Sequence, residues 1–203
     1  MKIKICGLTS IKEAEYLNEN AVDFAGFVLF FPKSKRNISI AKAKEIFFAL
    51  HSSIKKVAVV VSPTLEQVRK IEAAGFDYIQ IHGSLEDCLL SQINIPVLKA
   101  FNIKDMEQYE RFQNNPKIAG YVFDALEPGS GKTFDWKLVT NLPRDEKLFL
   151  LAGGLQPDNV ADAIAAIQPN GVDVSSGVEF VDKPGKDAEK IKRFVTNVRS
   201  ALS

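Results

Sequence analysis

The sequence contains few of the residues that form disulfides or hold metal ions. Its 203 residues include two cysteines, two histidines and one tryptophan. Two cysteines are too few for a disulfide framework, which indicates a reducing compartment, and we expect the protein to be cytoplasmic. His51 and His82 have no paired cysteines near them, so we expect no metal ion.

The sequence also lacks an excess of charge and a long apolar run. Its 26 lysines and arginines against 25 acidic residues give a net charge of +1, without the basic surplus of a nucleic-acid-binding protein. The longest apolar run, residues 24–31, contains Gly26 and is shorter than the ~18 residues of a membrane span. The N-terminus lacks the apolar segment of a signal peptide. We therefore expect a compact enzyme or small-molecule binder with neither nucleic-acid nor membrane partners.

Short runs with strand character alternate with helical patterns along the chain. Several runs are continuously apolar, as at residues 57–61, which is typical of a parallel sheet buried on both faces. Ser10 with Glu13, and Thr64 with Gln67, have the spacing of capping boxes at helix starts. The eight predicted strands cover residues 3–6, 23–29, 56–61, 78–82, 97–101, 120–124, 148–152 and 171–174.

The number of strand–helix units predicts the architecture. Eight units leave about 25 residues each, which fits a (β/α)8 barrel. An open doubly wound sheet is the alternative, but its glycine-rich turn is absent after the first strand, which ends at Cys6 and Gly7. No linker or change of composition divides the chain. We predict an α/β protein with one domain, a (β/α)8 TIM barrel over residues 1–203, and we expect a monomer.

Polar residues at predicted strand ends are the candidates for chemistry, because barrel enzymes place their sites there. Cys6 ends the first strand and could act as a nucleophile or base, or be a small buried apolar residue. Asp124 ends the sixth strand and either caps a loop or acts as an acid or base, and Asp173 in the eighth strand poses the same question. His82 ends the fourth strand, where lining the site and packing inside the barrel mouth explain it equally well.

Two turns of small residues follow the seventh and eighth predicted strands. Gly153 and Gly154 form the first, and Ser175, Ser176 and Gly177 form the second. Barrels commonly build phosphate sites from backbone amides at these two positions, so we predict a phosphate cradle there rather than merely flexible loops.

Residues 129–133, Gly-Ser-Gly-Lys-Thr, resemble half of a P-loop. The full pattern needs a glycine five positions before the Gly-Lys pair, and Leu126 occupies that position. We therefore expect no nucleotide hydrolysis and interpret this run as a loop over the site.

Five motifs occur in order along the chain, at residues 4–9, 80–83, 129–136, 151–155 and 171–179. Together they resemble the phosphoribosylanthranilate isomerase family of tryptophan biosynthesis. The resemblance implies a (β/α)8 fold and an Amadori rearrangement by general acid–base catalysis. This reaction converts N-(5-phosphoribosyl)anthranilate, a phosphorylated small molecule, to 1-(2-carboxyphenylamino)-1-deoxyribulose 5-phosphate without a cofactor.

By this resemblance Cys6 is the general base, Asp124 the general acid, and Arg36 the partner of the anthranilate carboxylate. Lys35 stands where the family usually has proline, which leaves the backbone before Arg36 less constrained. The segment 184–187 is one residue shorter than the family pattern, so the start of the last helix stays open. The predicted substrate-binding residues are Arg36, His82, Gly153, Gly154, Asp173, Ser175, Ser176 and Gly177.

The two catalytic roles oppose the ordinary pKa values of about 8.5 for a thiol and about 3.9 for an aspartate. We therefore predict that the site lowers the pKa of Cys6, through a cation such as Lys4 or through a helix terminus. We also predict that desolvation and the substrate anions raise the pKa of Asp124.

Two alternative functions remain. The Amadori isomerase of histidine biosynthesis resembles a duplicated half-barrel with an aspartate where Cys6 stands. A non-catalytic phosphate-binding module would keep the glycine turns but would not need both Cys6 and Asp124.

Overall fold

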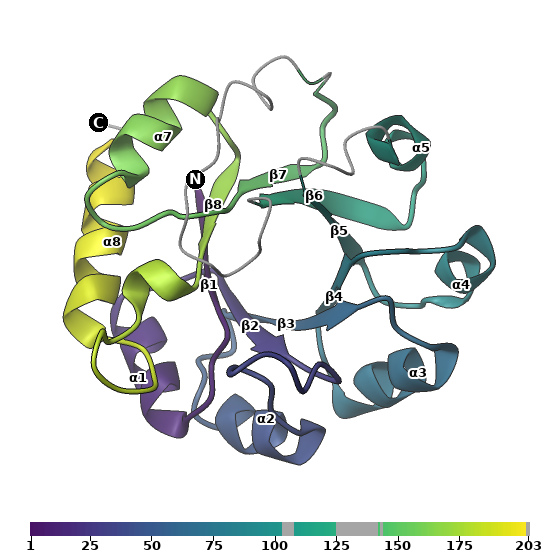
Figure 1. The fold of residues 1–203 in the computed structure, drawn as a ribbon, viewed down its shortest axis with the longest axis horizontal. Coiled ribbons are helices and arrows are strands. Elements are labelled where there is room, and N and C mark those ends of the chain that lie inside the picture. Colours follow the sequence, from purple (N-terminus) through teal and green to yellow (C-terminus); the bar gives the residue numbers. More distant parts are fainter. Residues whose placement is uncertain (103–107, 125–141, 143, 202–203) are drawn as a thin grey trace.

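Eight parallel strands close into a barrel in the order in which they occur in the chain. The computed structural model describes residues 1–102, 108–124, 142 and 144–201. Strand β8 pairs with β1, so the predicted barrel is confirmed and the open doubly wound sheet is excluded. Figure 1 looks into this barrel, with the helices around its outside. The strands are β1 (Lys2–Cys6), β2 (Phe24–Val28), β3 (Lys55–Val61), β4 (Tyr78–His82), β5 (Val97–Asn102), β6 (Ile118–Asp124), β7 (Leu148–Leu151) and β8 (Gly171–Val174).

Both predicted capping boxes are present. The backbone N–H of Ser10 donates to Glu13 at 3.0 Å, and that of Thr64 donates to Gln67 at 2.9 Å, so donors with no partner inside the helix are satisfied. Among the described helices, none combines the length and the apolar character needed to cross a membrane. The helices are α1 (Ile11–Glu19), α2 (Ile40–Phe47), α3 (Leu65–Ala74), α4 (Asp87–Gln92), α5 (Tyr109–Gln113), α7 (Val160–Ile167), α8 (Ala188–Ser200) and the 3-10 helix η2 (Ser176–Val178).

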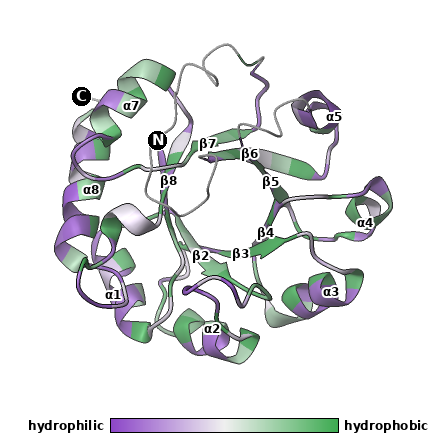
Figure 2. Ribbon diagram, viewed as in Figure 1, coloured by the Kyte–Doolittle hydropathy of each residue, from purple (hydrophilic) through white to green (hydrophobic). Residues whose placement is uncertain are grey.

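Alternation along the strands separates two apolar clusters. On β1, Ile3 and Ile5 belong to the large cluster that also contains residues of the helices, whereas Cys6 belongs to a smaller cluster with Val57 and Leu98 of other strands. Successive side chains of a strand point to opposite faces, so the smaller cluster fills the barrel and the larger one lies outside it. Figure 2 shows hydrophobic residues along most of the strands, and both hydrophobic and hydrophilic residues on the surrounding helices.

The last helix starts at a side-chain cap. Asp187 accepts hydrogen bonds from the backbone N–H groups of Glu189 and Lys190, at 3.0 and 3.3 Å, so the shortened segment 184–187 still begins α8 in an ordinary way. The predicted strands agree with the observed ones to within two residues. The loop predicted from residues 129–133 lies outside the described residues.

Candidate active site

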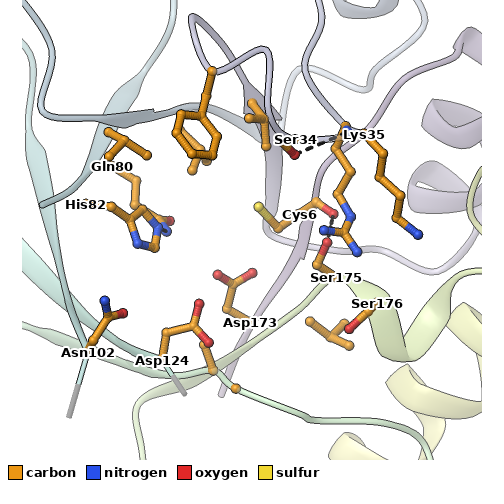
Figure 3. A pocket seen from close by; sticks show the side chains of 18 of the residues that line it. Cys6, Ser34, Lys35, Gln80, His82, Asn102, Asp124, Asp173, Ser175 and Ser176 are labelled. Carbon is orange, nitrogen blue, oxygen red and sulfur yellow. Dashed lines mark hydrogen bonds between the residues drawn. The ribbon is translucent and has the colours of Figure 1, made fainter. Parts of the chain in front are cut away.

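A cavity of about 700 Å³ opens at the C-terminal ends of the strands, large enough for a small-molecule substrate. Figure 3 shows side chains that project into it from β1, β4, β6 and β8, including Cys6, His82, Asp124 and Asp173. The structure therefore brings together residues that are more than 160 positions apart in sequence. The predicted site residues that line the cavity are Cys6, Arg36, His82, Asp124, Gly153, Gly154, Asp173, Ser175 and Ser176.

A buried ion pair lies beside Cys6. The Nζ of Lys4 is 2.8 Å from the Oδ2 of Asp173, and the two side chains are 0% and 7% exposed. Burial alone would lower the pKa of Lys4, but the charges of Asp173 and Cys6 and hydrogen bonds to both raise it above its ordinary value. Lys4 therefore stays an ammonium group, two residues along the same strand from the thiol.

The structure contradicts the predicted direction of the Cys6 pKa. Burial raises the pKa of this thiol, and the positive charge of Lys4 reduces that rise without reversing it. Asp173 adds to the rise because its negative charge opposes a thiolate, while Lys186 acts in the same sense as Lys4. The sequence correctly predicted a cation near Cys6. It did not indicate that the end of β1 is so enclosed that desolvation outweighs the effect of this cation on the pKa.

His82 is a neutral group in this site. Burial, together with the charges of Lys4 and Lys99, lowers its pKa to about 3. Its Nε2 lies 2.9 Å from the side-chain amide nitrogen of Gln80. An amide nitrogen only donates, so His82 accepts this hydrogen bond through Nε2 and carries its proton on Nδ1.

Three buried side-chain oxygens of the cavity wall have no hydrogen-bond donor within the described chain. They are Gln80 Oε1, Asn102 Oδ1 and Asp173 Oδ1. A buried acceptor without a donor is unfavourable by about 1–3 kcal/mol, so these atoms suit a ligand that donates hydrogen bonds. Neither Gln80 nor Asn102 was predicted from the sequence as a site residue. Gln80 lies two residues before His82 on the same strand, so its side chain points to the same face as that of His82. Asn102 follows the fifth predicted strand, and in the structure it is in register with Asp124 at the end of the next strand.

Arg36 reaches the cavity, but its guanidinium is partly engaged. Its Nε and Nη2 donate to the carboxylate of Glu179 at 2.5 and 3.1 Å, an ion pair that the sequence analysis did not anticipate. Burial opposes ionisation of Glu179, yet the Arg36 hydrogen bond and the charge of Lys186 hold its pKa at about 2. Lys35 also pairs with Glu179, at 2.8 Å, so the residue that replaces the proline contributes an ion pair of its own.

The two turns of small residues meet at the cavity. Gly153 and Gly154 have φ values of +80° and +67°, a conformation that favours glycine. The hydroxyl of Ser175 donates to the carbonyl of Cys6 at 2.9 Å, so it ties this turn to the end of β1. Gly177 does not line the cavity, in contrast to Ser175 and Ser176. A Cβ there would come within 2.0 Å of the Leu155 carbonyl oxygen, so its lack of a side chain lets the turns pack together.

Among the described residues, no three histidine, cysteine or acidic side chains gather as ligands for a metal ion. The cavity instead combines cationic groups at the rim, glycine turns and buried polar side chains. This fold and this site define a (β/α)8-barrel enzyme that acts on an anionic small molecule.

The comparisons with known proteins identify the family. Residues 3–197 match the family model of N-(5'phosphoribosyl)anthranilate (PRA) isomerase, and the chain belongs to this family. It is 39% identical over 200 residues to N-(5'-phosphoribosyl)anthranilate isomerase of Streptococcus mutans, with 98% of each chain covered. It is 36% identical over 204 residues to that of Bacillus cereus, again with 98% of each chain covered.

Solved structures agree with this assignment. The crystal structure of phosphoribosyl anthranilate isomerase from Thermotoga maritima is similar, with a TM-score of 0.85, 35% identity, and coverage of 98% of this chain and 99% of the other. A phosphoribosyl anthranilate isomerase in complex with reduced 1-(o-carboxyphenylamino)-1-deoxyribulose 5-phosphate is also similar. Its TM-score is 0.82 at 34% identity, with 98% and 99% of the two chains covered.

Proposed function

We propose that this chain isomerises N-(5-phosphoribosyl)anthranilate to 1-(2-carboxyphenylamino)-1-deoxyribulose 5-phosphate in tryptophan biosynthesis. The observation that carries the assignment is that Cys6 and Asp124 project into one cavity from β1 and β6. The same cavity is bordered by Gly153 and Gly154 and by Arg36. A thiol and a carboxyl group in one pocket, with sites for two anions around them, match the needs of this reaction.

The proposed mechanism uses one acid and one base. Asp124 protonates the ring oxygen as the bond from that oxygen to C1 breaks and the ribose ring opens. Cys6, as a thiolate, then removes the proton from C2, which yields the enolamine that tautomerises to the ketone. The Lys4 ammonium stabilises the thiolate during this step, because it is the charge that most lowers the pKa of Cys6. The raised pKa of the free thiol makes the ionised base strong but sparsely populated at neutral pH.

The polarity of the cavity matches that of the substrate along its length. The substrate has a phosphate at one end and a carboxylate at the other, and between them it has hydroxyl groups and an amine N–H. The cavity offers glycine turns and Arg36 for the anions, and the unpartnered oxygens of Gln80, Asn102 and Asp173 for the donors. We therefore assign these three oxygens to the ribose and amine portion of the substrate.

The alternatives make different demands on the site. An Amadori isomerase of the histidine type would have an aspartate at the end of β1, where this chain has Cys6. A phosphate-binding module would have no use for an acid and a base in the same cavity.

The proposal includes a cytoplasmic location, one domain and a monomer. The free thiol of Cys6 suits a reducing compartment. A Thermotoga maritima relative is described as dimeric, so light scattering of the purified protein tests whether this chain is a monomer.

A fluorescence assay tests the function directly. Phosphoribosylanthranilate is fluorescent and its product is not, so the signal should decay when the enzyme is added. The gene should also restore growth of an auxotroph that lacks this step of tryptophan synthesis. Purified, folded protein that binds a phosphate ligand without consuming the substrate would instead support the binding module.

A further inference from the structure

The carboxylate of Glu179 contacts three cationic side chains, of which Lys35 and Arg36 line the cavity and Lys186 is buried behind them. Its Oε1 accepts from the Nε of Arg36 at 2.5 Å and from the Nζ of Lys186 at 3.1 Å. Its Oε2 accepts from the Nη2 of Arg36 at 3.1 Å and lies 2.8 Å from the Nζ of Lys35. Arg36 and Lys35 belong to the loop after β2, whereas Lys186 precedes α8. One carboxylate therefore connects two loops that are distant in sequence.

The contact with Glu179 leaves a definite part of Arg36 available. A guanidinium has five N–H donors, and Glu179 engages one on Nε and one on Nη2. Within the described chain, the remaining N–H groups on Nη1 and Nη2 donate to no protein acceptor. These two nitrogens form the second forked edge of the guanidinium, which fits a carboxylate with two parallel hydrogen bonds.

The rest of the Arg36 side chain is also constrained. A Cβ at position 7 would lie 2.5 Å from the Cδ of Arg36, so the arginine stem runs directly over Gly7. The backbone N–H of Arg36 donates to the hydroxyl of Ser34 at 3.2 Å. The backbone and stem are therefore fixed locally, and Glu179 is the group that sets the rotation of the guanidinium plane.

The charges leave the cluster attractive to an anion. Lys35, Arg36 and Lys186 carry three positive charges against the single negative charge of Glu179. A second carboxylate can therefore approach Arg36 without a net repulsion from the cluster. Lys186 is 1% exposed, so Glu179 also supplies the counter-charge that this buried ammonium needs.

We propose that Glu179 is a positioning residue that holds one edge of the Arg36 guanidinium, so that the opposite edge binds the carboxylate on the aromatic ring of the substrate. This inference rests on the proposed function, because it assigns a specificity role within the same site. It predicts that Glu179 contributes to affinity only when the ligand has that carboxylate. A purely structural role for Glu179 would weaken the binding of all ligands of the cavity alike.

The test compares two probes by titration calorimetry. The first is reduced 1-(o-carboxyphenylamino)-1-deoxyribulose 5-phosphate, and the second is the same compound without the carboxyl group. The wild type should prefer the first probe. In Glu179→Gln, affinity for the first probe should fall about 10- to 50-fold, whereas affinity for the second should change less than about 3-fold. Equal losses for both probes, or no loss for either, would overturn the proposal.

Two further variants complete the comparison. Glu45→Gln is the matched control, because it makes the same change in the exposed ion pair of Lys42 and Glu45 on α2, which does not line the cavity, so both affinities should stay within about 3-fold. The double variant with Glu179→Gln and Lys186→Met leaves no buried ammonium without its counter-charge. It replaces Glu179→Gln if that single variant does not fold. If the wild type neither binds the first probe nor turns over the substrate, the proposed function fails. If it does both and Glu179→Gln keeps the preference, only the positioning role fails.

Discussion

Lys4 and Asp173 form an ion pair of 2.8 Å inside the barrel, between neighbouring strands and in direct register. The pair places a positive charge beside Cys6 and leaves the second oxygen of Asp173 without a donor among the residues that the structure describes. A lysine that is fully buried is rare unless it is paired, and this pairing accounts for the retained charge. The two residues thus connect the stability of the barrel to the ionisation of the proposed base.

Replacing Lys4 with methionine should destabilise the protein and make Cys6 harder to ionise. The variant leaves the carboxylate of Asp173 buried without its cation, so we expect a loss of about 3–5 kcal/mol in the free energy of unfolding, measured in urea. Lys4→Met with Asp173→Asn should recover much of this loss. The pH dependence of Cys6 alkylation by iodoacetamide should also move to higher pH in Lys4→Met, and an unchanged profile would contradict the role of Lys4.

Cys6→Ser and Asp124→Asn should each lower kcat by about 10²- to 10⁴-fold, because each removes one proton-transfer group. The fluorescence assay measures this loss, and circular dichroism checks the fold. Cys88→Ser is the control, since Cys88 is exposed on α4 and does not line the cavity. Wild-type rates in both of the first two variants would reject the mechanism.

The residual kcat/KM of Asp124→Asn should rise with pH through the neutral range. This variant lacks the carboxyl group that must stay protonated, so its pH profile reports the ionisation of Cys6 alone. The raised pKa of Cys6 means that the thiolate fraction of the free enzyme still increases above pH 8. The fluorescence assay at pH 6 to 10, with the fold checked at each pH, measures this rise. A plateau already reached near pH 6 would show that the free enzyme holds Cys6 as a thiolate, which would contradict the effect of burial.

Acid should destabilise the fold through His82. The folded pKa of about 3 lies below the value of about 6.5 expected in the unfolded chain, so the unfolded state binds the proton first. The stability from the neutral imidazole is therefore complete above about pH 6.5 and is lost as pH falls toward 3. Relative to His82→Gln, the wild type should lose about 1.4 kcal/mol between pH 7.5 and 5.5. A constant difference between the two proteins would mean that His82 titrates normally.

Gly177→Ala should disturb the junction of the two turns. The added Cβ would meet the Leu155 carbonyl oxygen at 2.0 Å, and we expect a loss of about 2–3 kcal/mol in stability together with a higher KM. Gly75→Ala is the control, because Gly75 has a φ of +86° with open space around it, which predicts a loss of about 1 kcal/mol and unchanged kinetics. Equal kinetic constants in the two variants would show that Gly177 does not contribute to phosphate binding.

Local patterns in the sequence were sufficient to predict the barrel and many of the residues that line the cavity. Capping residues such as Thr64 and strand ends such as Cys6 and Asp124 are set by short-range rules, so their positions could be predicted. The pKa of Cys6 could not, because it depends on how completely seven other strands enclose the thiol. The pairing of Arg36 with Glu179 joins residues 143 positions apart, and no spacing rule connects them.

The sequence by itself determined which residues stand at strand ends, since hydrophobic periodicity and turn chemistry act over a few residues. Only the tertiary structure decided which of these ends share a wall, which charges neutralise one another, and which polar atoms stay without a partner. Closure of the barrel sets the register between strands, and a shift of one residue on β1 would turn Lys4 and Cys6 away from the cavity. Desolvation and ion pairing follow from that closure, because both depend on the distance between segments that the chain order leaves undefined.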